Sequence, residues 1–445
     1  MVLILDNIGE LVTMEGPRSP RRGSLQGTIG VVRDAFLAAR DDKVIATGQR
    51  KDLPALLNEL EQSRKEDHGS DGREAREEVV VLDVGGRTVV PGFVDAHTHL
   101  VFAGWRHNEY AMRCQGATYQ EILRAGGGIL ETVRQTRQAT EEALFHRALS
   151  FLDEMLSSGT TCVEIKSGYG LEIETEMKQL RVIRNLRAEH CVEAVPTFLP
   201  AHAIPPEYSR DREGYIQEII GSMLPLVRRE GLARFLDVFC DEGAFTPREA
   251  RRILTRGKEL GYGIKLHADE LRNTQGAELG ASLGAVSVDH LCMISQDGVR
   301  ALRDSETIAV LLPATSCFLG KDPGKLARKL VDAGIPVALG TDFNPGTSPT
   351  TSMPLCMTLA CSMGGLTPAE SLTAATWNAA WAIGLGGRVG GLLPGMQADA
   401  LVLDADSYVE IPYRFGTNLV WKVIKKGKVV FQANKGRMVT QGESQ

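Results

Sequence analysis

The chain has 445 residues, of which 43% are hydrophobic and 24% charged, with a formal net charge of −6. This composition is typical of a globular protein, and the mild acidity argues against a nucleic-acid partner. No apolar run approaches the roughly 18 residues of a membrane span, and the first residues lack the basic and long apolar regions of a signal peptide. We therefore expect no membrane or nucleic-acid partner, and either two or three average domains or one large α/β barrel with an accessory domain.

Eight cysteines are scattered singly through apolar segments, without a C-x-x-C motif. This pattern is typical of reduced, buried thiols in a cytoplasmic protein rather than of a disulfide framework or a thiolate zinc site. We therefore predict a cytoplasmic location. Any metal is expected to have nitrogen and oxygen ligands.

Both ends of the chain have the pattern of β-structure. In residues 1–90, short apolar runs at 3–5, 30–32, 44–46 and 79–82 alternate with turns, and 53–60 is expected to be helical. The charged stretch 63–78 is expected to be a solvated loop or helix edge, with disorder a further possibility. Residues 389–445 return to the β pattern at 399–403, 419–424 and 429–431. The two ends predict one small composite β-sandwich domain.

Residues 91–388 alternate apolar strands with longer helical patterns. The strands are expected just before His97 and at 161–165, 192–199, 235–240, 264–267, 286–290, 308–312 and 337–342. Eight such units predict a (β/α)8 TIM-like barrel as the catalytic domain. In this fold, functional side chains gather at the carboxyl-terminal ends of the strands.

His97 and His99 follow the apolar run 87–94. On a strand they point to the same side, which provides half of a metal site, although an isolated H-x-H could equally be two solvated loop histidines. Of the nine histidines, five fall at predicted strand ends and favour the metal interpretation: His97, His99, His202, His267 and His290.

Two further segments supply carboxylates. Glu270, three residues after His267, is suited to accept a proton from water activated by a metal, and Asp269 is expected to cap the next helix. Asp342 ends the last strand and completes a His3Asp set for a divalent or ferric ion, with an Asx-turn acceptor as its alternative role. His290 is expected to polarise a substrate carbonyl, or else to be a satisfied, hydrogen-bonded histidine.

These residues together resemble the amidohydrolase superfamily and, within it, the imidazolonepropionase family, over nearly the whole chain. The resemblance is carried by the motifs PGFVDAHTH at 91–99, GWRHNE at 104–109, GATY at 116–119, AGGGI at 125–129, EIKSGYGL at 164–171, DVFC at 237–240, HADE at 267–270 and TDFNPG at 341–346. The GGGI, KSGYG and DFNP segments are far more specific than H-x-H.

The resemblance implies a metal-dependent amidohydrolase with a barrel and a composite β-domain. It implies hydrolysis of the cyclic amide of 4-imidazolone-5-propanoate to N-formimidoyl-L-glutamate, the third step of histidine degradation, with one Zn2+ or Fe3+ ion per subunit in a homodimer. The metal ligands implied are His97, His99, His267 and Asp342, with Glu270 as general base and His290 as the assisting histidine. The substrate-binding positions implied are Arg106, Tyr169, His202, Glu270, Asn344, Gly346 and Thr347.

Two residues bear on the choice between enzymes of this type. Arg106 offers a planar fork suited to the propionate carboxylate. Lys166, placed on the third proposed strand, is interpreted as structural or as support for the ring loop, rather than as a carboxylated metal bridge. The alternatives are a cytosine- or guanine-deaminase-like amidohydrolase, whose neutral substrate needs no carboxylate clamp, and a non-catalytic scaffold, which would be expected to have lost a ligand.

Overall fold

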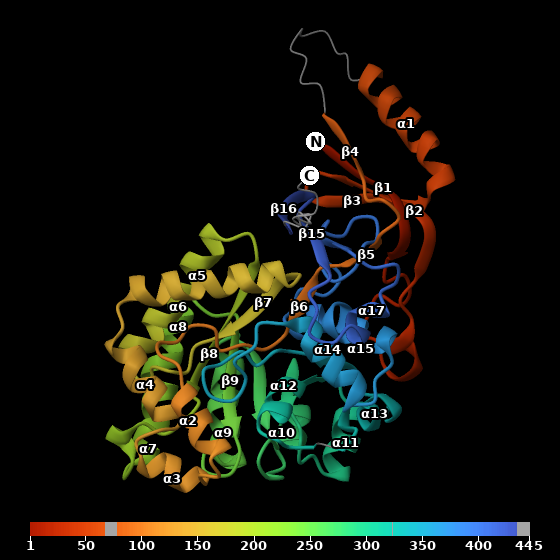
Figure 1. The fold of residues 1–445 in the computed structure, drawn as a ribbon. Coiled ribbons are helices and arrows are strands. Elements are labelled where there is room, and N and C mark those ends of the chain that lie inside the picture. The colour runs from red at the N-terminus through yellow and green to blue at the C-terminus, as the bar shows by residue number, and fades with distance from the viewer. Residues whose placement is uncertain (67–77, 323, 434–445) are drawn as a thin grey trace, which may run out of the picture.

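The computed structural model describes residues 1–66, 78–322 and 324–433. Figure 1 shows two parts, a helix-covered barrel and a β-domain beside it, in which the strands from the two ends of the chain lie together. Part of the charged stretch, residues 67–77, lies outside the described residues, whereas the predicted helix is confirmed as α1 (Leu53–Glu66).

The barrel strands form one sheet of eight in the order β13-β12-β11-β10-β9-β8-β7-β6, in which every pair is parallel. The predicted TIM-like barrel is therefore confirmed. Its strands are β6 (Phe93–Asp95), β7 (Thr160–Lys166), β8 (Glu193–Ala201), β9 (Phe235–Cys240), β10 (Gly263–Ala268), β11 (Ser287–His290), β12 (Ile308–Leu311) and β13 (Val337–Leu339). The placement of Lys166 on the third strand is wrong: β7 is the second barrel strand.

The barrel closes where the segments after β6 and β13 meet. The Asp342 backbone N–H donates to the His97 carbonyl oxygen at 2.9 Å, and the His99 N–H donates to the Phe343 carbonyl oxygen at 2.9 Å. Gly340 permits this approach, because a Cβ atom there would lie 2.8 Å from the His97 Cβ. Closure thus brings two candidate ligand segments together from distant parts of the sequence.

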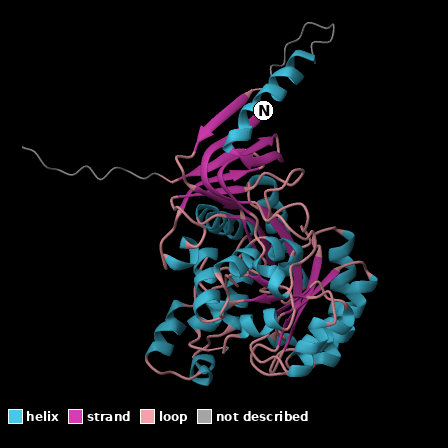
Figure 2. Ribbon diagram, turned by 90° about the vertical axis from the view of Figure 1, so that its right-hand side faces the viewer, coloured by secondary structure: helices cyan, strands magenta, loops and turns pink. Residues whose placement is uncertain are grey.

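Helices surround the strands, as Figure 2 shows from the side. An example is α5 (Glu141–Ser157), whose Leu144, Ala148, Leu152 and Met155 recur on one buried face and whose N-terminus is capped by Thr140. The other helices of this region are α2 (His107–Cys114), α3 (Tyr119–Arg124), α4 (Ile129–Gln138), α6 (Ile173–Glu189), α7 (Arg212–Glu218), α8 (Leu224–Arg229), α9 (Pro247–Glu259), α10 (Gly276–Leu283), α11 (Gln296–Arg303), α12 (Pro313–Phe318), α13 (Leu326–Asp332), α14 (Met353–Ser362), α15 (Pro368–Ala375) and α16 (Trp377–Ala382).

The β-domain is composite, as predicted. Its eight strands form one sheet in the order β16-β15-β14-β5-β1-β2-β3, with β4 also paired to β1. Alternate residues of β1 face opposite sides: Leu3 and Leu5 pack in an apolar cluster with strands from the C-terminal part, whereas Val2 and Ile4 pack with α1. The elements are β1 (Val2–Val12), β2 (Val31–Arg40), β3 (Lys43–Gln49), β4 (Val79–Asp83), β5 (Thr88–Pro91), β14 (Ala400–Leu403), α17 (Glu410–Tyr413), β15 (Val420–Lys425) and β16 (Lys428–Gln432).

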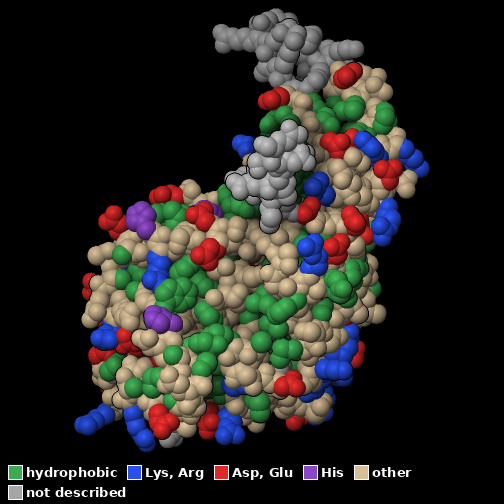
Figure 3. Space-filling model, viewed as in Figure 1, with side chains coloured by type: hydrophobic (Ala, Val, Ile, Leu, Met, Phe, Trp, Pro, Cys, Tyr) green, Lys and Arg blue, Asp and Glu red, His purple; other side chains and the backbone are tan. Residues whose placement is uncertain are grey.

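The surface in Figure 3 carries acidic and basic side chains interspersed with apolar ones. Among the helices within the described ranges, none has the length and apolar character needed to cross a membrane.

Candidate metal and active site

Three imidazoles and one carboxylate meet at the carboxyl-terminal end of the barrel strands. The Nε2 atom of His99 lies 3.2 Å from that of His97 and 3.3 Å from that of His267. Asp342 Oδ1 lies 3.5 Å from Nε2 of both His97 and His99. All four side chains are buried. The structure therefore brings together the four residues predicted as metal ligands.

The carboxylates next to these histidines suit a bound cation. His97 Nδ1 lies 2.6 Å from Asp289 Oδ2, and His267 Nδ1 lies 3.0 Å from Asp237 Oδ2. A carboxylate that accepts the Nδ1 proton leaves the Nε2 lone pair directed at the centre. His99 Nε2 can donate a proton to only one of its two Nε2 neighbours, whereas a cation between the three nitrogens would satisfy all of them.

The protonation of His97 and His99 also fits a metal, whereas at His267 burial is outweighed by the nearby Asp237 carboxylate, which raises the pKa. Burial lowers the pKa of His97 and of His99 well below the usual histidine value, which favours the neutral form that binds metals. Burial raises the pKa of Asp342 to about 7, and its Oδ2 accepts a hydrogen bond of 2.6 Å from Thr315 on α12. A nearby cation would favour the ionised carboxylate. A set of three nitrogens and one oxygen is suited to zinc or iron.

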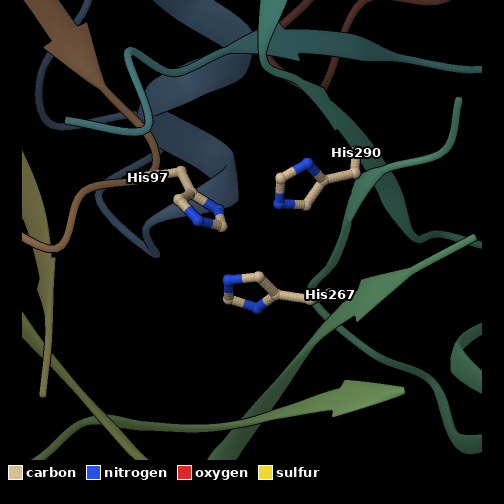
Figure 4. A group of neighbouring side chains, drawn as sticks. All are labelled: His97, His267 and His290. Carbon is tan, nitrogen blue, oxygen red and sulfur yellow. The ribbon is translucent and has the colours of Figure 1, made fainter. Parts of the chain in front are cut away.

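His290 and Glu270 lie beside this cluster. Figure 4 shows the rings of His97, His267 and His290 turned toward one another, and their donor atoms lie within 4.8 Å of each other. Glu270 Oε2 is 3.7 Å from His290 Nδ1, and burial raises the pKa of Glu270. Both residues predicted as catalytic thus lie within reach of the metal cluster.

The loop that carries Glu270 is held from both sides. Asp241 accepts hydrogen bonds from the backbone N–H of Glu270 at 2.7 Å and of Leu271 at 2.9 Å. Asp269 accepts from the backbone N–H of Gly276 and Ala277 at the start of α10, which confirms its predicted capping role. The Glu270 side chain therefore projects from a fixed backbone.

His202 and Tyr169 form one wall of the site. The His202 ring stacks on His99 with 4.9 Å between centroids, and its Nδ1 lies 3.0 Å from the Gly168 carbonyl oxygen. Burial lowers the pKa of His202 to about 3, so the ring is neutral near pH 7. Burial raises the pKa of Tyr169, Arg106 opposes this shift and Asp342 adds to it. The Tyr169 hydroxyl is thus within electrostatic reach of both the guanidinium and the metal cluster.

Arg106 lies against the loop that follows Asp342. A Cβ atom on Gly346 would stand 2.1 Å from Arg106 Nη1, so only glycine allows this approach. Asn344 shapes the same loop, because its Oδ1 accepts from the backbone N–H groups of Gly346 and Thr347, each at 2.8 Å. The Asn344 side chain and Thr347 therefore form hydrogen bonds with the loop in which they lie.

Arg106 also lines a cavity of about 430 Å³ formed by the segment between β6 and α4 together with α4 itself. Trp105, Glu109, Gly126 and Gly127 belong to its walls. The AGGGI segment identified in the sequence therefore lies beside the guanidinium.

Several residues that support the site were assigned no role from the sequence. Asp237 and Asp289 contact metal-site histidines, Asp241 fixes the Glu270 loop, and Glu109 binds Arg106. The available signal for Asp237 was an acidic residue within an otherwise apolar, mostly buried strand, and the signal for Asp289 was its place beside His290 on a short strand.

The comparisons with known proteins agree with this architecture. The amidohydrolase family model matches residues 88–430. Among solved structures, A. niger ochratoxinase aligns with a TM-score of 0.68 at 18% identity, covering 97% of this chain and 96% of that one. E. coli guanine deaminase aligns with a TM-score of 0.65 at 16% identity, covering 98% and 100%. At these identities the likeness shows the fold alone.

Sequence relatives are much more similar. The imidazolonepropionase of Symbiobacterium thermophilum is 47% identical over 98% of both chains. That of Geobacillus kaustophilus is 51% identical over 80% of this chain and 84% of the relative, and that of Alkaliphilus metalliredigens is 42% identical over 98% and 99%. The resemblance inferred from the motifs is confirmed: the chain belongs to the imidazolonepropionase family of the amidohydrolases.

Proposed function

We propose that this enzyme hydrolyses the cyclic amide of 4-imidazolone-5-propanoate to N-formimidoyl-L-glutamate. The observation that carries the proposal is the buried His3Asp cluster with Arg106 held against the loop that follows its aspartate. The cluster is suited to water activation, and the guanidinium is suited to a carboxylate on the substrate. A single site thus contains groups suited to the cyclic amide of the substrate and to its carboxylate.

The metal ligands in this proposal are His97, His99, His267 and Asp342, which hold one Zn2+ or Fe3+ ion. When bound, such an ion polarises a carbonyl group and lowers the pKa of water toward about 7. The side chains that face it supply binding and proton transfer.

Arg106 is proposed to bind the propionate through the Nη1 side of its guanidinium, which lies next to Gly346. Tyr169 and His202 then flank the ring. The phenol, which burial keeps protonated, donates a hydrogen bond to it, and the neutral imidazole, whose Nδ1–H is donated to the Gly168 carbonyl oxygen, accepts one at Nε2. Asn344, Gly346 and Thr347 shape the loop on the propionate side. This arrangement fixes the ring carbonyl over the His3Asp cluster.

Glu270 is proposed as the general base. Its carboxylate accepts a proton from the attacking water as the oxygen–carbon bond forms at the ring carbonyl. His290, neutral because burial lowers its pKa, donates a hydrogen bond to the carbonyl oxygen as negative charge develops there. Glu270 then returns its proton to the leaving ring nitrogen. The carbon–nitrogen bond breaks, and the carbonyl carbon becomes that of a carboxylate.

We also propose a homodimer located in the cytoplasm. The location is supported by the cysteines, all eight of which are free thiols. The dimer is an expectation from the family resemblance, and sedimentation of the purified protein tests it.

The deciding experiment follows the imidazolone absorbance of freshly prepared 4-imidazolone-5-propanoate after addition of the zinc- or iron-loaded enzyme. We expect the absorbance to disappear and N-formimidoyl-L-glutamate to accumulate in equal amount, with a much slower reaction for Glu270→Gln. Unchanged absorbance, together with ammonia release from cytosine or guanine, would show a deaminase instead.

A further inference from the structure

Lys166, whose role the motifs left open, is the centre of a buried group of charges beneath the metal cluster. Its Nζ lies 2.8 Å from Glu164 Oε1, 2.8 Å from Asp237 Oδ2 and 3.6 Å from Asp289 Oδ2, and all four side chains are fully buried. Burial alone would lower the pKa of Lys166, but the carboxylates raise it above the usual lysine value. Three buried carboxylates thus share a single ammonium group.

Two of these carboxylates lead directly to candidate metal ligands. Asp237 Oδ2, which lies 2.8 Å from the ammonium, is also 3.0 Å from His267 Nδ1. Asp289 Oδ2 is 2.6 Å from His97 Nδ1. A single aspartate therefore separates Lys166 on β7 from His267, and another separates it from His97.

The third carboxylate leads to the H-x-H segment. Glu164 Oε2 accepts a hydrogen bond of 3.4 Å from the Thr98 backbone N–H, and the Thr98 hydroxyl donates to the Glu164 carbonyl oxygen at 2.7 Å. The Lys166 backbone N–H donates to the Thr98 carbonyl oxygen at 2.9 Å. Thr98 stands between His97 and His99, so these contacts fix the backbone from which both rings project.

We infer that Lys166 is a positioning residue of the metal site, whose ammonium holds Asp237 and Asp289 in place so that they orient His267 and His97. The inference rests on the proposed function only in assuming that these histidines bind a metal. Without the ammonium, carboxylates crowded in a dry interior would repel one another and move apart. An ion pair that serves only the barrel core would leave the affinity for metal unchanged.

The test is the affinity of the full-length, metal-stripped protein for Zn2+, measured by competition with a chromophoric chelator and without substrate. We expect Lys166→Met to weaken Zn2+ binding by about 10- to 100-fold, as for other residues that orient ligands. The matched control is Lys425→Met, which removes a buried lysine paired with Asp399 at 2.7 Å in the β-domain. It is expected to lower stability while keeping the wild-type Zn2+ affinity.

A second variant covers the case in which Lys166→Met does not fold. Lys166→Gln keeps a hydrogen-bond donor without the charge, and it is expected to weaken Zn2+ binding by about tenfold and to alter the visible spectrum of the Co2+-loaded protein. Wild-type Zn2+ affinity in a folded Lys166 variant would overturn the inference. Loss of folding in both variants, with Lys425→Met folded, would also overturn it by assigning the lysine to the core. Failure of the wild type to bind Zn2+ would instead refute the proposed metal site.

Discussion

Arg106 donates two hydrogen bonds to the carboxylate of Glu109, from Nε at 2.9 Å and from Nη2 at 2.7 Å. Glu109 Oε1 also accepts from the Gly128 backbone N–H at 2.9 Å, which ties the guanidinium to the AGGGI segment. The guanidinium that is proposed to bind the substrate is therefore already oriented before substrate arrives, with its Nε–Nη2 edge occupied by Glu109. Its remaining Nη1 faces Gly346.

Replacement of the fork should affect substrate binding more than chemistry. Arg106→Lys loses the planar geometry, and a hydrogen bond to a charged group contributes roughly 1.5–3 kcal/mol, so KM should rise about 10- to 100-fold while kcat changes little. Glu109→Gln should raise KM less, because the amide oxygen still accepts one bond. Steady-state kinetics decides this, with Asp6→Asn as control, since Asp6 pairs with Arg50 in the same geometry in the β-domain. A fall in kcat at unchanged KM would contradict the role.

Gly346→Ala should displace the guanidinium without unfolding the protein. The added Cβ would meet Arg106 Nη1 at 2.1 Å, and the end of a long side chain can move aside. We expect KM to rise about tenfold with the unfolding temperature nearly unchanged. Gly221→Ala is the control, because a Cβ there meets nothing within 4 Å. Equal KM for both variants would show that the contact with Gly346 is irrelevant to binding.

Glu270 should determine the acid limb of the pH profile. A general base works only when ionised, and burial raises the pKa of Glu270 above its usual 4.5. As pH falls through that raised pKa, kcat/KM should therefore decline, and the midpoint of this decline should lie at a pH higher than 4.5. Glu270→Gln should lower kcat by about 10²- to 10⁴-fold and lose this limb. Metal content must be measured at each pH, because acid also releases metal. An unchanged limb in the variant would rule out this residue as the titrating base.

Removal of the metal should lower stability as well as activity. A ligand that binds only the folded state stabilises it by about 2.7 kcal/mol at 100 times its Kd. Chemical denaturation of chelator-treated protein, with and without added Zn2+, measures this difference. His267→Ala should abolish the response to Zn2+, whereas His146→Ala, an exposed histidine on α5, should retain it. A response that survives in the first variant would place the metal elsewhere.

The sequence was sufficient for the barrel and for the residues at its strand ends, because both follow from local periodicity and motif. The contact between His97 and Asp289 was not predictable in this way. These residues are 192 positions apart, His97 just after β6 and Asp289 on β11, so their contact depends on how the closed barrel staggers its strands. The same holds for Lys166. Of its three partners, Glu164 lies on the same strand, whereas Asp237 and Asp289 lie on β9 and β11. Glu109, by contrast, is three residues from Arg106 near a helix N-terminus, a spacing that the sequence already displays.

The pairing of β5 with β14 has a consequence for how the molecule is made. Thr88 of β5 pairs with Leu403 of β14, so the whole barrel is translated between the two strands. At 5–20 residues per second, about 300 intervening residues separate their emergence from the ribosome by roughly 15–60 s. During that interval one edge of the N-terminal strands is open to pairing with other nascent chains. The barrel is therefore translated before the strand that completes the sheet joining the two ends, and crowding of ribosomes on one message would favour pairing between the open edges of neighbouring chains.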